Sequence, residues 1–132
     1  MNNIPKVISI KIDKIDIFRG LEFLTLSDIL LPKGFKANQQ FMIRFSPGAK
    51  GGNHKHSRME VFISLDPLSL IWLDTKNTKH KIQMGLDSKE RIKAIIMYPN
   101  IPHVVINKEK TKATLIEFAS EDLINPEVVT II

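Results

Sequence analysis

Short apolar and β-branched runs, separated by turn-forming residues, follow one another along nearly the whole chain. The run Val7-Ile-Ser-Ile-Lys-Ile12 alternates between apolar and polar residues, as a strand with one buried face does. No segment has convincing helical periodicity over three turns. We therefore predict an all-β sandwich or barrel. Strands are expected at residues 7–12, 21–25, 40–45, 59–65, 68–74, 79–84, 91–98, 104–107 and 112–119.

The connections between these runs allow more specific expectations. Residues 59–65 and 68–74 should form a hairpin, because Asp66-Pro67 between them favours a turn. A helical turn is expected at residues 26–31. Residues 86–90 should form either another helical turn or a loop.

Composition is that of one soluble globular domain. The 132 residues are enough for one core, with 43% hydrophobic and 25% charged residues and no linker, so residues 1–132 are expected to form a single domain. The absence of cysteine excludes disulfides and thiolate metal sites. Lys6, Lys11 and Asp13 interrupt the apolar N-terminus, which therefore has neither a signal-peptide core nor a membrane span. A cytoplasmic protein without a membrane partner is expected.

The net charge of +5 is spread rather than concentrated. With no basic run and only 7% aromatic residues, nucleic-acid binding is not expected. A mildly positive field would favour an anionic small molecule, although a solvated surface explains the charge equally well. Two loops are expected to carry lysines, at positions 76, 79 and 81 and at positions 108, 110 and 112.

Two histidines, His54 and His56, are followed by Glu60. On one extended strand all three side chains would point the same way. Imidazole and carboxylate together suit one divalent first-row metal, with Zn, Mn, Fe, Ni and Co all acceptable. His103, far downstream, offers a fourth donor. The alternatives are surface histidines on an edge strand, an exposed Glu60 and a structural His103.

Two segments resemble the paired sequence motifs of the cupin superfamily. They are Gly48-Ala-Lys-Gly-Gly-Asn-His54-Lys-His56-Ser-Arg-Met-Glu60 and Tyr98-Pro-Asn-Ile-Pro-His103-Val-Val-Ile-Asn107, within residues 40–119. Pro67 replaces the closing glycine of the first motif, and Asn100 replaces the glycine of the second. Asparagine tolerates a positive φ, so the second turn can survive.

The resemblance implies a single-domain jelly-roll barrel, also called a double-stranded β-helix. It implies a metal in the barrel mouth, held by three histidines and one glutamate. By that match the ligands are His54, His56, Glu60 and His103. Cupins also include members that have lost the metal and keep the barrel for binding, and a homodimer is expected from the family.

Other residues could line the same cavity. Arg44 could bind a carboxylate or phosphate, or face outward. Tyr98 could act as an acid or hydrogen-bond donor, or pack in the core. Asn107 could fix a turn or orient a ligand, and His80 is expected at the surface. Core packing is expected for three aromatic residues, Phe62, Trp72 and Phe118.

Three kinds of function are compatible with these residues. The first choice is a small metal-dependent isomerase or epimerase acting on a sugar derivative or another small polar substrate, because a Lewis-acidic metal can polarise a carbonyl or an enediolate. With Fe or Mn the chain could instead be a dioxygenase. A second possibility is a sugar-binding module without catalysis, and a third is an accessory subunit whose metal is structural or absent.

The segments Phe18-Arg19-Gly20, Gly52-Asn-His-Lys-His56 and Leu115-Ile-Glu-Phe-Ala-Ser-Glu-Asp122 resemble small cupins of nucleotide-sugar and surface-polysaccharide pathways. These include the dTDP-4-keto-6-deoxyglucose ketoisomerases, whose histidines move protons without a metal. That family has Arg-Gly before the first histidine and glutamine where this chain has Glu60. Both departures favour the metal. If the metal-free chemistry applied, His54 or His56 would be the base.

Overall fold

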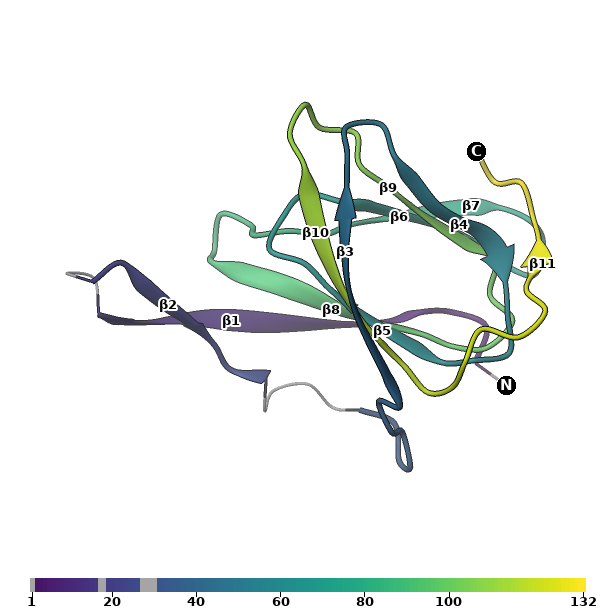
Figure 1. Cartoon of the computed structure of the whole chain (residues 1–132), viewed down its shortest axis with the longest axis horizontal. Helices are drawn as coiled ribbons and strands as arrows, with labels where there is room; N and C mark the ends of the chain where they lie inside the picture. Colours follow the sequence, from purple (N-terminus) through teal and green to yellow (C-terminus); the bar gives the residue numbers. More distant parts are fainter. Residues whose placement is uncertain (1, 17–18, 27–30) are drawn as a thin grey trace.

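Two antiparallel β-sheets curl around a common interior in the computed structural model, which describes residues 2–16, 19–26 and 31–132 (Figure 1). The strands are β1 (Lys6–Asp16), β2 (Leu21–Leu24), β3 (Gln39–Phe45), β4 (Lys50–Lys55), β5 (Glu60–Ile63), β6 (Ser69–Leu73), β7 (Lys79–Gln83), β8 (Arg91–Met97), β9 (His103–Ile106), β10 (Ala113–Ala119) and β11 (Glu127–Val128).

One sheet has the order β2-β1-β8-β5-β10-β3 and the other the order β11-β4-β9-β6-β7. Strands that are neighbours in sequence, such as β3 and β4, often belong to different sheets, which is how a jelly roll closes. The expected all-β jelly-roll barrel is confirmed. None of the described elements is a helix long and apolar enough to cross a membrane.

The core is divided by the alternation of side chains along each strand. On β8, Ile95 and Met97 face the barrel interior, where they pack with Phe45, Phe62 and Leu115. The alternate residues of β8, Ile92, Ala94 and Ile96, face the outer surface of the six-stranded sheet and form a second cluster with residues of β1 and β5. Residues 94–97 of β8 are buried on both faces, and this part of the strand is a continuous apolar run.

The expected hairpin between residues 59–65 and 68–74 is wrong. Strand β5 pairs with β8 and β10, whereas β6 pairs with β7 and β9. The chain does bend just before Pro67, at Leu65-Asp66, but the bend carries the chain from one sheet to the other. A turn signal fixes where a strand ends and leaves its pairing partner open.

Smaller expectations have mixed outcomes. Lys79 and Lys81 lie on β7 and not in a loop, so His80 between them is on a strand, although it is exposed as expected. Residues 86–90 form a loop. The helical turn expected at residues 26–31 falls mostly on residues 27–30, which lie outside the described part of the chain.

Candidate metal centre

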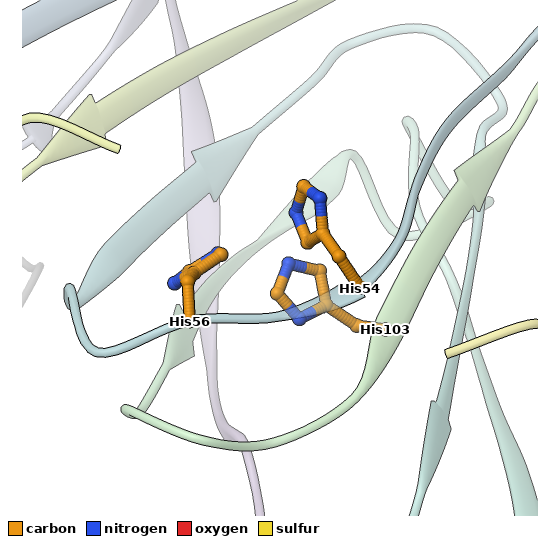
Figure 2. Close-up of side chains that lie close together, drawn as sticks. All are labelled: His54, His56 and His103. Atoms are coloured by element: carbon orange, nitrogen blue, oxygen red, sulfur yellow. The ribbon is translucent and has the colours of Figure 1, made fainter. Parts of the chain in front are cut away.

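Three histidines meet inside the barrel, as Figure 2 shows for His54, His56 and His103. His54 on β4 pairs directly with His103 on β9. The three ring centroids are 5.0 to 5.3 Å apart. One ring nitrogen from each histidine lies within 4.8 Å of the others, a spacing that a single cation can bridge.

Glu60 reaches this cluster from the opposite sheet. The expectation that His54, His56 and Glu60 share one extended strand is wrong, because β4 ends at Lys55 and Glu60 begins β5. The intervening residues turn a corner between the sheets. The four side chains therefore converge through the closure of the barrel and not through the alternation of one strand.

The histidine tautomers follow from backbone contacts. Nδ1 of His56 lies 3.1 Å from the carbonyl oxygen of Arg58, and Nδ1 of His103 lies 2.8 Å from that of Ile101. A carbonyl only accepts, so each Nδ1 carries a proton and donates it. In the neutral rings each Nε2 then presents a lone pair to the centre of the cluster, the arrangement found in metal-bound histidines.

The Glu60 carboxylate presents another lone pair to the same point. Its Oε1 lies 2.7 Å from Nε2 of His56 and 3.2 Å from Nε2 of His103. The shorter contact lacks hydrogen-bond geometry, and both of its atoms are buried without a hydrogen-bond partner. Buried lone pairs this close repel one another unless a cation lies between them. The donor set therefore fits a divalent metal, and a proton on an imidazole is the alternative cation.

Arg58 holds the other oxygen of Glu60. Its Nε and Nη2 donate to Oε2 at 2.9 and 2.7 Å, and the guanidinium is buried. This two-pronged contact leaves Oε1 as the oxygen directed at the histidines. Burial raises the pKa of the Glu60 carboxyl, but contacts with His103, His56 and Glu117 outweigh it, so the pKa lies well below the usual range and Glu60 is ionised.

Glu117, on β10, adds a second carboxyl to the site. Burial, its hydrogen bond with Glu60 and the negative charge of Glu60 raise the pKa of Glu117 to about 9. Glu117 is therefore protonated at neutral pH and can donate a hydrogen bond. By contrast, burial and the charges of His103 and His56 lower the pKa of His54 to about 4, so the His54 imidazole is neutral and free to act as a ligand or base.

His54, Glu60 and His103 line a cavity of about 150 Å³. Five apolar side chains line the cavity beside five polar or charged ones, and the apolar ones are Ile43, Phe45, Phe62, Val105 and Leu115. Ligand sites for drug-sized molecules usually have volumes of roughly 300–1,000 Å³. Only a small molecule, or one ring of a larger one, can therefore reach the histidines.

The structure does not bring the other candidate residues to this cavity. Arg44 is exposed on β3, between Ile43 and Phe45, which face inward. Tyr98 packs between the two core clusters. Asn107 is fully buried, and its amide binds the backbone of residues 45, 109 and 111, the contacts that a turn-fixing residue makes.

The three aromatic residues expected in the core differ in their surroundings. Phe62 lines the cavity, with its ring centroid 5.9 Å from that of His103. Trp72 is buried and stacks on His80 with a centroid separation of 4.4 Å. Phe118 packs in the cluster on the outer surface of the six-stranded sheet and not inside the barrel.

Gly52 allows β4 to approach β9 beside the cluster. A Cβ at this position would lie 2.8 Å from the carbonyl oxygen of His103, and φ is +118°. We expect Gly52→Ala to lower the free energy of unfolding by about 1–3 kcal/mol through backbone strain and by about as much again through overlap. Gly34→Ala is the matched control, because φ there is +80° with open space around it, so only strain applies. Urea unfolding measures both, and equal losses would contradict the close approach.

No protein-family model matches the sequence, and no curated protein sequence matches it significantly. Solved structures do match. CapF from Staphylococcus aureus, a capsular polysaccharide assembling protein, superposes with a TM-score of 0.61 at 14% identity over 70% of this chain. This chain spans only 28% of CapF.

Two other similar structures are matched over nearly their full length. A mutant of the 3,4-ketoisomerase QdtA from Thermoanaerobacterium thermosaccharolyticum, in complex with TDP-4-keto-6-deoxyglucose, gives a TM-score of 0.68 at 16% identity, covering 95% of this chain and 85% of QdtA. A dTDP sugar isomerase from Desulfovibrio desulfuricans gives 0.73 at 10% identity, covering 95% and 83%. At such identities the likeness establishes a shared cupin-type fold and leaves the activity open.

Proposed function

We propose that this chain is a metal-dependent isomerase or epimerase that acts on a sugar derivative. One divalent ion would be held by Nε2 of His56 and His103, a ring nitrogen of His54 and Oε1 of Glu60. The observation that carries the proposal is the convergence of buried lone pairs without hydrogen-bond partners. When bound, the metal would supply Lewis-acid stabilisation of a carbonyl or enediolate oxygen.

The remaining residues of the site have separate roles in this proposal. Arg58 donates two hydrogen bonds to Oε2 of Glu60 and so leaves Oε1 directed at the centre. Glu117, protonated, donates its single O–H to Glu60, and its other oxygen can accept a hydrogen bond from a substrate hydroxyl that enters the cavity. The apolar wall limits the water that reaches the reacting atoms, which strengthens these electrostatic interactions.

The substrate class is supported by the structural neighbours and by the size of the cavity. Two of the neighbours are sugar isomerases, and QdtA was crystallised with a TDP-linked keto sugar. A cavity of about 150 Å³ can admit a sugar ring but not an attached nucleotide. We therefore place any nucleotide outside the barrel mouth. A single cytoplasmic domain that forms a homodimer completes the proposal.

Proton transfer without a metal is the second candidate. A proton on Nε2 of His56 would also relieve the contact with Glu60 Oε1. His54, neutral at pH 7, would then be the base that takes the sugar proton beside the keto group. Binding of a sugar without catalysis remains the alternative if neither chemistry is found.

The amount of metal bound per chain distinguishes the metal-dependent function from proton transfer without a metal. Untagged protein purified without chelator or added metal should contain close to one divalent ion per chain by plasma mass spectrometry. Iron would direct assays to oxygen consumption, whereas zinc, manganese or nickel would direct them to isomerisation. Protein that is metal-free and does not take up added metal would overturn the metal proposal and favour the histidine pair acting alone.

A further inference from the structure

Strand β4 contains a bulge immediately before its first metal-ligand candidate. The register between β4 and β9 pairs Gly52 with Val104 and then His54 with His103, so Asn53 is an extra residue without a partner. Asn53 has a φ of +59°. If β4 continued past Gly52 with regular alternation and no bulge, Asn53 would point into the barrel and His54 outward. The bulge is therefore what turns His54 toward His103.

The C-terminal segment binds this bulge through residue 53. The Asn53 amide Nδ2 donates to the carbonyl oxygen of Ile132 at 3.0 Å. Its Oδ1 accepts from the backbone N–H groups of Ile131 and Ile132 at 3.0 and 3.3 Å. The Asn53 carbonyl oxygen accepts from the N–H of Val129 at 2.8 Å. Both the side chain and the backbone of the extra residue are thus held by residues 129–132.

Strand pairing and apolar contacts fix the same segment to the barrel. Strand β11 pairs along β4, with Val128 opposite His54. Ile131 is 4% exposed and packs on the outer surface of the five-stranded sheet, against Ile71, Leu73 and Val104. Burial of the Ile131 side chain therefore adds an apolar contact to the strand pairing that holds this segment.

We propose that residues 127–132 form a clasp that stabilises the bulge at Asn53 and so positions His54 for metal binding. Asn53 is a positioning residue, because it touches the clasp and not the cluster. The proposal rests on the proposed metal site. A left-handed asparagine costs little by itself, but a strand without the bulge competes with it, and the four hydrogen bonds from the clasp favour the bulged form.

Cobalt(II) alone is a suitable probe, because its visible spectrum reports ligand geometry. We expect Asn53→Ala and a chain lacking residues 129–132 each to bind Co²⁺ about 10–100-fold more weakly, the range found when support around a metal ligand is removed, with an altered visible spectrum. Combining the two changes should weaken binding no further than one alone, because both remove the same contacts. Asn53→Gly accepts the positive φ and tests the lost amide contacts should the alanine variant not fold.

The control is Asn77→Ala, because Asn77 is exposed and also has a positive φ, +62°, but lies outside the clasp and the cluster, and this variant should bind Co²⁺ like the unaltered chain. Unchanged Co²⁺ affinity and spectrum in both Asn53→Ala and the shortened chain would overturn the clasp. If the unaltered chain binds no Co²⁺, the proposed metal function fails and the clasp is tested separately by the His54 imidazole ¹⁵N resonances in metal-free protein. Resonances that move in both variants would support the clasp, and resonances that stay in place would overturn it.

Discussion

The variants His54→Ala and His103→Ala should each lose most of the bound metal while the barrel still folds. Each substitution leaves two nitrogens and one carboxylate oxygen. Because loss of an outer-shell partner already lowers metal affinity about 10–100-fold, loss of a ligand should lower it by more than about 100-fold. Metal per chain, measured by plasma mass spectrometry after dialysis, checks the result.

The matched control is His80→Ala. His80 is also a histidine on a strand, but it lies outside the cluster and contacts Asp74 and Trp72. Its replacement should leave the metal content unchanged. All three variants should fold, because the barrel core is built mainly from aliphatic and aromatic residues, and circular dichroism checks this. Full metal content in both His54→Ala and His103→Ala would refute the ligand assignment.

The sequence predicted where the strands lie better than how they pair. Alternation located the strands from β5 to β10 to within a few residues, because it depends on local burial. Strand pairing depends on closure of the whole barrel, so the hairpin expected at Asp66-Pro67 was wrong. The turn at Asn100 could be predicted, because its φ of +65° is one that asparagine adopts more readily than most residues.

The four metal-ligand candidates could be predicted from the sequence, but the charged side chains that surround them were not. A motif gives the residue types, and closure of the barrel then brings Glu60 from the opposite sheet. Glu117 carried a usable signal, because it lies between inward-facing Leu115 and Ala119 on a strand with alternating burial. Arg58 follows β4 in a corner of irregular conformation, where no periodicity predicts which way a side chain points.

Asn53 illustrates a different limit. The register of β4 depends on a bulge that is held by a segment more than seventy residues away. The last residues of the chain contain only a two-residue strand, β11, and no alternation long enough to predict it. Contacts of this kind follow from the closed fold and leave no pattern in the local sequence.

Replacing Arg58 with methionine should have the largest effect on stability, and the effect should depend on metal. Glu60 is 1% exposed, and Arg58 is the permanent positive charge that contacts it. Without metal, Arg58→Met leaves that carboxylate buried without its guanidinium partner, and removal of one partner from a buried ion pair typically costs about 3–5 kcal/mol. A bound divalent ion would supply a new positive charge at Oε1, so part of the lost stability should return.

Urea unfolding in chelator and in saturating zinc measures this difference. In chelator, Arg58→Met should unfold at a much lower urea concentration than the unaltered chain, and the gap should narrow in zinc. Arg91→Met is the control, because Arg91 binds Ser9 near the surface and its loss should cost about 1 kcal/mol in either condition. The double change Arg58→Met with Glu60→Leu should recover stability in chelator, because it removes both charges together. A deficit for Arg58→Met that is the same with and without zinc would mean that no cation binds at Glu60 Oε1.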